Sequence, residues 1–235
     1  MTAQHASPHR ISRESIRAGE LRAQYKSADL SAAILSDAAH RCSVRETLRN
    51  RPDGAGDVWL FAYGSLIWNP MVDFVEKRVA LVRGFHRRFC MWTHIYRGSP
   101  ADPGLVLGLV PGGSCRGVAY RIAAEDAQAE LELVWRREMI NGGYHPTWLR
   151  TMTAGGRGWA LGFVSDRRYA GYAGLLPEER VAGIVARARG YAGSCAAYLF
   201  DTTAHLESLG IRDAALWRVR DRVKQLIENN DKNGG

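Results

Sequence analysis

The stretch FAYGSLIWNP, residues 61–70, is the most informative part of this 235-residue sequence. The apolar run that ends at Ala62 is typical of a buried strand, yet it stops abruptly at Tyr63-Gly64-Ser65 and a second apolar run follows. Glycine directly after a strand permits a sharp turn and the close approach of a ligand, and the N–H groups of such a turn can bind an anion. The residues alone leave two interpretations open, an ordinary tight turn and a ligand-binding turn. Ser65 is not in a nucleophile elbow, because the G-x-S-x-G pattern is absent.

The composition is that of a globular protein, with 46% hydrophobic and 24% charged residues. A chain of this length builds one full core with additions, or at most two small domains. Since the sequence holds no apolar run of about 18 residues and the N-terminus lacks the apolar segment of a secretory signal, we expect no membrane partner and a cytoplasmic location.

Metal and nucleic-acid partners are not expected. The four cysteines are widely spread and the seven histidines form no metal-binding spacing, so we expect reduced thiols and no metal site. The net charge of +8 has two interpretations, a basic face for nucleic acid and a general field that attracts small anions. No nucleic-acid-binding motif accompanies the charge, which favours small anions.

The first 56 residues are interpreted as a helical, partly disordered N-terminal extension, with disorder expected over 1–9. A short helix is expected to begin at Ser12, which provides an N-cap, and a second helix to run over about 30–49. The turn-rich segment 51–56 then separates this extension from the main domain, residues 57–235.

The main domain is predicted to be α+β, because mostly adjacent strands precede a helical tail and no βαβ repeat is seen. Turns, including a hairpin turn at 111–114, separate strands expected at about 57–63, 78–83, 86–94, 105–110 and 116–122. A helix is expected over 125–140, followed by strands at about 147–154 and 158–165 and by helices at 177–190, 194–208 and 211–229.

Glu138 is the candidate acid within the predicted 125–140 helix. Helical spacing places it beside Val134 and Trp135, and a carboxyl group against apolar neighbours has the raised pKa that suits proton transfer. The residues alone favour the simpler alternative of a solvated glutamate or a partner for a neighbouring arginine.

The ordered set of motifs resembles the ChaC family of glutathione-specific γ-glutamylcyclotransferases over roughly 57–225. The segment 61–70 resembles the family's signature. Four further blocks, each made of two parts, follow in the family's order. They lie at 87–90 and 96–100, at 103–109 and 112–120, at 135–139 and 143–148 (Gly143, Tyr144 and Trp148), and at 171–174 and 198–200.

The resemblance implies a small mixed β-barrel with flanking helices, and an enzyme that cleaves glutathione into 5-oxoproline and cysteinylglycine without cofactor or metal. It implies Glu138 as the catalytic residue. It also implies that substrate is bound by the segment after the first strand and by one tyrosine beyond the acid, which here are Leu60, Phe61, Ala62, Tyr63, Gly64, Ser65, Leu66 and Tyr144.

This reaction explains the residue types. The substrate's own α-amine attacks its γ-carbonyl, so no protein nucleophile is needed and orientation of one molecule supplies about 7–11 kcal/mol. A single carboxyl group can take a proton from the amine and deliver one to the departing nitrogen, and N–H donors of the 63–66 turn can stabilise the oxyanion and hold the α-carboxylate.

One departure from the family pattern leaves alternatives open. The family often has an acidic residue before its late Tyr-Leu-Phe, whereas Ala197 precedes Tyr198 here. The first alternative is therefore a cyclotransferase for another γ-glutamyl amine or peptide. The second is a non-catalytic regulatory module linked to cation transport, since the family's name derives from such a gene cluster. The sequence predicts no particular oligomeric state.

Overall fold

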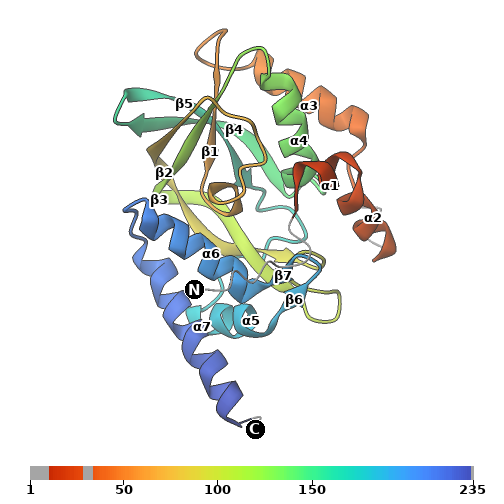
Figure 1. The fold of residues 1–235 in the computed structure, drawn as a ribbon, viewed down its shortest axis with the longest axis vertical. Coiled ribbons are helices and arrows are strands. Elements are labelled where there is room, and N and C mark those ends of the chain that lie inside the picture. Colours follow the sequence, from red (N-terminus) through yellow and green to blue (C-terminus); the bar gives the residue numbers. More distant parts are fainter. Residues whose placement is uncertain (1–10, 29–33, 234–235) are drawn as a thin grey trace, which may run out of the picture.

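A computed structural model describes residues 11–28 and 34–233, and a closed β-barrel lies at its centre (Figure 1). The barrel order is β1-β3-β2-β4-β5, and a parallel contact between β1 and β5 closes it at Leu60 and Leu161. The antiparallel pairs β1–β3, β2–β3, β2–β4 and β4–β5 make up most of the sheet. The bounds are β1 Val58–Ala62, β2 Glu76–Thr93, β3 Gly104–Ile122, β4 Tyr144–Thr153 and β5 Gly156–Ser165. The mixed β-barrel expected from the family resemblance is confirmed.

Strand β1 is buried on both faces, as its continuous apolar run predicts. Leu60 and Ala62 belong to the main core, which the β-strands share with helices α4 (Ala127–Glu138), α5 (Glu178–Arg187) and α6 (Cys195–Ser208). Phe61 and Tyr63 belong to a second cluster to which all five barrel strands or their ends contribute, so this cluster fills the barrel interior.

Strands β2 and β3 are longer than predicted, and the expected hairpin turn at 111–114 is wrong. Phe85 pairs with Pro111 and Arg83 pairs with Ser114, so the ladder continues past an irregularity on both strands. Gly84, Gly112 and Gly113 have φ angles of 84°, 107° and 66° at this point. Glycine allows these positive φ values in a turn and in a bulge alike, which is why the sequence pattern indicated a chain reversal where the structure bends a strand.

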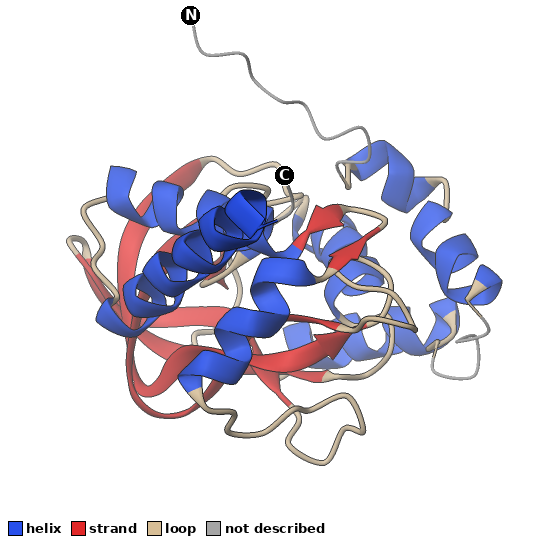
Figure 2. Cartoon of the chain, turned by 90° about the horizontal axis from the view of Figure 1, so that it is seen from below, coloured by secondary structure: helices blue, strands red, loops and turns tan. Residues whose placement is uncertain are grey.

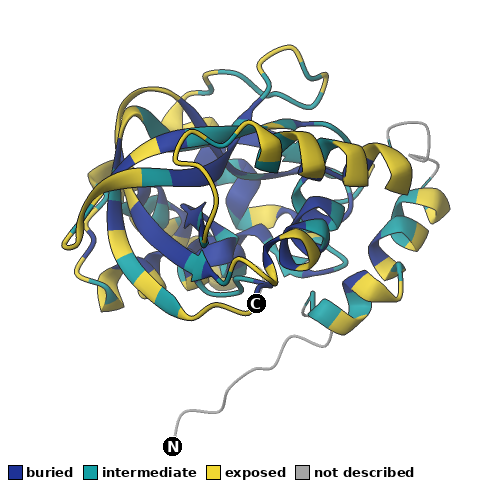
Figure 3. Cartoon of the chain, turned by 90° about the horizontal axis from the view of Figure 1, so that it is seen from above, coloured by how far each residue is buried: buried dark blue, intermediate teal, exposed yellow. Residues whose placement is uncertain are grey.

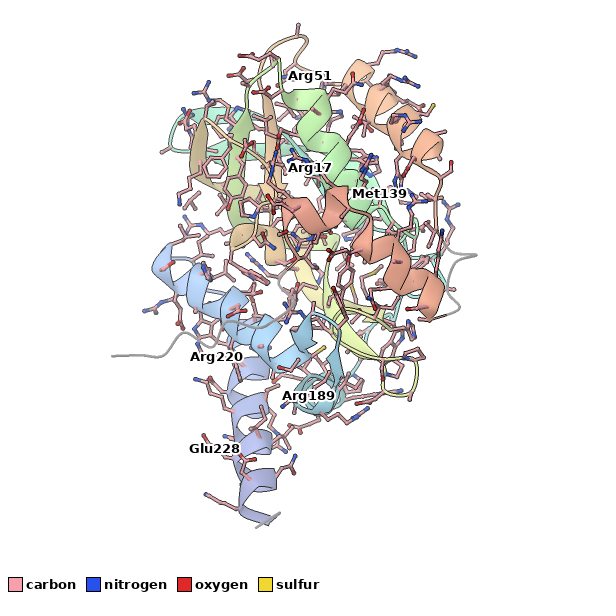
Figure 4. All side chains as sticks on the ribbon, turned by 45° about the vertical axis from the view of Figure 1, so that its right-hand side comes forward. Arg17, Arg51, Met139, Arg189, Arg220 and Glu228 are labelled. Carbon is pink, nitrogen blue, oxygen red and sulfur yellow. The ribbon has the colours of Figure 1, made fainter. Side chains whose placement is uncertain are left out.

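The helices after β3 agree with the expected ones to within a few residues. They are α4 Ala127–Glu138, α5 Glu178–Arg187, α6 Cys195–Ser208 and α7 Ala214–Asn233, and the short strands β6 Arg189–Gly190 and β7 Gly193–Ser194 lie between α5 and α6. The three C-terminal helices pack together on one side of the barrel (Figure 2). Buried residues concentrate on the barrel strands, while outer helix faces are exposed (Figure 3). Helix α7 extends beyond the body, with Glu228 on its projecting part (Figure 4).

Within the described ranges, no helix is long and apolar enough to cross a membrane.

Residues 11–28 and 34–56 of the N-terminal extension contain three helices, of which the sequence indicated two. Helix α1 Arg13–Arg17 has the predicted cap, because the Ser12 side chain accepts a hydrogen bond from Ser15 N. Helix α2 Glu20–Ser27 was not predicted. Helix α3 Asp37–Arg49 begins later than expected because Ser36 caps it, its side chain accepting from Ala39 N. The disorder expected over 1–9 lies outside the described residues.

The extension packs directly on helix α4. From α1, Arg13 Nη2 donates to Glu130 Oε1 at 2.7 Å, and Arg13 Nη1 donates to Met71 O at 3.1 Å. From α3, Ser43 Oγ accepts a hydrogen bond from Trp135 Nε1 at 3.1 Å. Figure 4 labels Arg17 on α1 and Met139 directly after α4; the backbone oxygen of Met139 lies 3.0 Å from His40 Nε2 of α3. The division at residue 56 stays a prediction, but the extension stabilises the helix that ends at the candidate acid.

The buried ion pair between α1 and α4 yields a stability prediction. Burial alone would raise the pKa of Glu130, but the hydrogen bonds from Arg13 and from Asp73 N, with the Arg13 charge, lower it overall. Glu130→Gln removes this charge from a side chain that is only 8% exposed, so we expect the free energy of unfolding in urea to fall by about 2 kcal/mol at neutral pH.

The matched control is Glu132→Gln, a partly exposed acid on the same helix that accepts a hydrogen bond from Gln128, for which we expect a change within about 0.5 kcal/mol. Because the pKa of Glu130 is lowered on folding, the difference between wild type and Glu130→Gln should shrink as the pH falls below 4.5. Equal effects of the two substitutions would contradict a stabilising role for the Arg13–Glu130 contact.

Candidate active site

A pocket of about 590 Å³ lies where the end of β1 meets α4 and α6. The turn after β1 contributes Tyr63 to Leu66, α4 contributes Arg137 and Glu138, and the extension contributes Ile11 and Tyr25. The remaining walls come from the segment after β2, from β3 and β4 and from α6, and include Arg97, Leu107, Tyr144, Ala197 and Tyr198.

The turn after β1 is held from two sides by buried arginines. Arg87, on β2, donates through Nη1 to Tyr63 O at 2.7 Å, and its Nε lies 2.9 Å from Asp213 Oδ2. Beyond Tyr63 the chain forms the 3-10 helix η2 Ser65–Ile67, in which Ile67 N bonds back to Gly64 O at 2.9 Å. The first N–H groups of such a helix have no acceptor within it, which leaves them able to bind a ligand.

Gly64 is required here for space. A Cβ atom at this position would lie 2.9 Å from the hydroxyl oxygen of Tyr198, which is closer than carbon and oxygen approach without movement. The absence of a side chain therefore lets α6 bring its tyrosine against the turn.

Arg137 joins helix α4 to the same turn. Its Nη2 donates to Ser65 Oγ at 2.6 Å and its Nη1 donates to Asn69 O at 2.9 Å. Its Nε lies 3.2 Å from the Glu138 carboxylate. The guanidinium is buried, so its charge is screened little, and it fixes the position of α4 relative to the turn.

Glu138 has the environment of a proton-transfer group. Its side chain exposes 15% of its surface, and in the described part of the chain its Oε1 accepts no hydrogen bond of good geometry despite the nearby Arg137. Burial raises the pKa of Glu138 above 4.5, and the charge of Arg137 acts in the opposite direction. The acid is thus close to a fixed positive charge and still retains its proton more readily than an exposed glutamate.

Tyrosines make up much of the pocket wall. The hydroxyl of Tyr63 donates to Phe163 O at 2.7 Å, that of Tyr144 donates to Leu107 O at 3.4 Å, and that of Tyr198 accepts from Leu107 N at 3.3 Å. Burial raises the pKa of all three phenols, and the neighbouring Glu138 adds to the shift. These phenols therefore stay neutral at physiological pH and present hydroxyl groups and ring faces.

Tyr96 differs from these tyrosines. It lines the same pocket, but its buried hydroxyl has no hydrogen-bond partner among the residues that the structure describes. A buried hydroxyl without a partner is unfavourable, and such groups in native structures call for an explanation. A ligand in the pocket would provide the missing partner.

The structure brings together most of the predicted site residues. Glu138, Tyr144 and the turn residues Tyr63, Gly64, Ser65 and Leu66 all line the pocket. The predicted substrate-binding residues Leu60, Phe61 and Ala62 do not. They are completely buried in β1, and the backbone there pairs with β3, so their placement supports a structural role.

Sequence reasoning did not assign roles to Tyr96, Arg97 or Arg137. All three lie in the motif blocks that carry the family resemblance, so the signal was present in the sequence. Their convergence on one pocket depends on contacts between segments far apart in the chain, such as that between Arg137 and Ser65.

No group of three or more His, Cys, Asp or Glu side chains suited to a metal ion occurs within residues 11–28 and 34–233. Cys42, Cys90, Cys115 and Cys195 form no disulfide in this structure.

The barrel with its helices defines a γ-glutamyl cyclotransferase fold. It superimposes on the crystal structure of a γ-glutamyl cyclotransferase specific to glutathione from yeast with a TM-score of 0.68 at 22% identity, covering 72% of this chain and 96% of that one. The chain belongs to the ChaC-like protein family, whose model matches residues 58–226.

Named relatives agree with this family. The chain is 40% identical to the glutathione-specific γ-glutamylcyclotransferase of Escherichia coli K12, over 82% of this chain and 83% of the relative. It is 33% identical to glutathione-specific γ-glutamylcyclotransferase 1 of Homo sapiens, over 75% of this chain and 84% of the relative.

The unpartnered hydroxyl of Tyr96 yields a second stability prediction. Tyr96→Phe removes a buried polar group that has no partner, so we expect the free energy of unfolding of the ligand-free protein to stay unchanged or to rise by up to about 1 kcal/mol. Tyr63→Phe is the matched control, because it removes the bond to Phe163 O and should cost about 1 kcal/mol. Urea unfolding measures both, and a loss of stability in Tyr96→Phe equal to that of the control would show that its hydroxyl has a protein partner.

Proposed function

We propose that this protein cleaves glutathione into 5-oxoproline and cysteinylglycine, with Glu138 as general base and then general acid. The observation that supports this most directly is the buried Glu138 carboxyl group, which has a free oxygen in a pocket shared with the turn after β1. The named relatives at 33–40% identity supply the substrate class.

The first step closes a ring within the substrate. The α-amine nitrogen of the γ-glutamyl group attacks the γ-carbonyl carbon, and Glu138 accepts the proton that the nitrogen loses. A raised carboxyl pKa lies closer to that of the groups with which it exchanges protons, so transfer in both directions near neutral pH is easier than for an exposed glutamate.

The second step breaks the amide bond between the γ-carbonyl carbon and the cysteinyl nitrogen. Glu138 returns its proton to this departing nitrogen, so its carboxyl group is ionised again at the end of the cycle. The two steps consume no water or cofactor and use no protein nucleophile. The N–H groups at the start of η2 are the donors that we assign to the negative charge developing on the carbonyl oxygen.

The pocket walls hold the curled substrate. Tyr63, Tyr144 and Tyr198 are fixed by their own hydrogen bonds, so their ring faces form a rigid surface for the γ-glutamyl chain. Orientation of the amine against its own carbonyl is the part of catalysis that such a surface supplies.

Ala197 lines the pocket and brings no polar group to it, so cleavage of another γ-glutamyl amine or peptide is the second candidate function. A panel of γ-glutamyl compounds separates the two. The cytoplasmic location expected from the sequence stays a prediction.

The activity is tested with purified protein and glutathione in the absence of added metal or cofactor. We expect 5-oxoproline and cysteinylglycine in equal amounts by mass spectrometry. Glu138→Gln keeps the size of the side chain but accepts no proton, so its kcat should fall by at least about 10²- to 10⁴-fold. Glu132→Gln, on the same helix, should keep wild-type turnover. Near wild-type activity in Glu138→Gln would exclude this acid as the base, and a folded wild type without product would exclude glutathione as the substrate.

The same variant has an expected signature in stability. Because the pKa of Glu138 is raised on folding, its neutral form favours the folded state, and wild type loses stability as the pH rises through the folded pKa. Glu138→Gln does not ionise, so its free energy of unfolding relative to wild type should increase from about pH 4 to about pH 8, by 1.4 kcal/mol for each pKa unit of the shift. Urea unfolding across this range measures it, and a difference that is flat with pH would mean that Glu138 titrates normally.

A further inference from the structure

A second arginine, Arg97, lines the pocket and has no role in the mechanism above. It lies between β2 and β3, in a segment whose backbone is firmly held. Cys195 Sγ donates to Arg97 O at 3.0 Å, and Ala192 N donates to Tyr96 O at 2.8 Å. The chain also passes so close to itself that a Cβ atom at Gly98 would lie 2.1 Å from Gly104 N. The side chain therefore projects from a rigid support.

The guanidinium of Arg97 is mostly unused by the protein. Its central carbon lies 5.9 Å from the ring centroid of Trp68 and 5.8 Å from that of Tyr198, and Nη1 donates one hydrogen bond to Ser194 O at 3.3 Å. Of the acids in the described ranges, none lies within 4.0 Å to form an ion pair with it. Burial lowers the pKa of Arg97, and the charge of the exposed Asp201, also at the pocket, opposes this shift only in part. An arginine has five N–H donors in a planar fork, so several remain for a ligand.

The two pocket arginines differ in what they can bind. Arg137 already has Ser65 Oγ, Asn69 O and the Glu138 carboxylate around it, whereas Arg97 has one backbone carbonyl. They also lie at different places relative to the acid. Arg137 Nε lies 3.2 Å from the Glu138 carboxylate, whereas Arg97 forms no ion pair within 4.0 Å with Glu138, and its central carbon lies 5.8 Å from the ring centroid of Tyr198. Arg137 thus lies beside the acid, and Arg97 lies beside Tyr198.

We propose that Arg97 binds the carboxylate at the C-terminal end of a γ-glutamyl peptide substrate, and so selects for leaving groups that carry a free carboxylate. The proposal rests on the proposed function, which places the γ-glutamyl end beside Glu138 and the turn. The rest of a tripeptide then extends past Tyr198 toward Arg97. A half-buried guanidinium beside aromatic rings can bind a carboxylate through paired, charge-assisted hydrogen bonds.

The test compares two substrates that differ only at the distal end. One is glutathione, and the other is glutathione whose glycine carboxylate is replaced by a carboxamide. The amide has the same size but no negative charge, so we expect wild-type kcat/KM to be about 10- to 100-fold lower for it, mainly through KM. Both peptides release 5-oxoproline, which reports on the γ-glutamyl end independently of the distal one.

Arg97→Gln completes a double-mutant cycle. Its kcat/KM should fall by about the same 10- to 100-fold on glutathione and change little on the carboxamide analogue, because that analogue lacks the carboxylate that Arg97 would bind. Arg97→Lys keeps the charge without the fork and should lie between wild type and Arg97→Gln on glutathione. Arg116→Gln, an exposed arginine on β3 outside the pocket, is the matched control and should show the wild-type preference.

Several results would overturn the proposal. Equal losses on both substrates in Arg97→Gln would mean that Arg97 acts only through the packing of Trp68 and Tyr198. If Arg97→Gln does not fold, the proposal is tested with wild type alone. Equal kcat/KM values of wild type for glutathione and for its carboxamide analogue would exclude a site for the distal carboxylate. If folded wild type releases 5-oxoproline from neither peptide, both the proposed function and this inference are wrong. If it releases 5-oxoproline equally well from both peptides, only the carboxylate site at Arg97 is wrong.

Discussion

The buried guanidinium of Arg137 donates hydrogen bonds to Ser65 Oγ and Asn69 O, and its Nε lies 3.2 Å from the carboxylate of Glu138. Through them one side chain connects the first barrel strand, its turn and the end of α4. Because Arg137 and Glu138 are consecutive, the side chain that contacts the turn and the acid that we propose as the proton-transfer group are held by the same end of α4. The arginine also limits the cost of ionising the acid, whose pKa burial has raised. Substrate geometry and acid strength therefore depend on the same contact.

The rest of the molecule supports this contact from outside. Helix α1 contributes the Arg13–Glu130 ion pair to the beginning of α4, and α3 packs along it through Ser43 and Trp135. On the opposite side of the turn, Arg87 links Tyr63 O to Asp213, which directly precedes α7. The extension and the C-terminal helices thus contribute to the site even where they supply no wall, and mutations far from the pocket are expected to act through α4 or through Arg87.

Some of this arrangement could be predicted from the sequence. The apolar run before Tyr63-Gly64-Ser65 predicted a buried strand and a turn, because both depend on local spacing. Spacing also placed Glu138 beside Trp135, but the residues alone favoured a solvated glutamate, and the catalytic role of Glu138 came from the family resemblance. The barrel itself came from the family resemblance. The bend at Gly84 and Gly112-Gly113 was mistaken for turns because glycine serves both, and Leu60 to Ala62 were assigned to substrate although they form core. Arg97, Tyr96 and Arg137 needed the three-dimensional fold, since their partners lie on other elements.

The two ends of the described chain differ in a way that affects how the protein is handled. Ile11 lines the pocket, whereas α7 contributes nothing to it and projects away from the body (Figure 1). Any affinity tag, fluorophore or surface linker attached at Ile11 would therefore lie at the pocket wall. The same group attached to the projecting part of α7 would lie away from the pocket, so α7 is the better position for immobilising or labelling the protein.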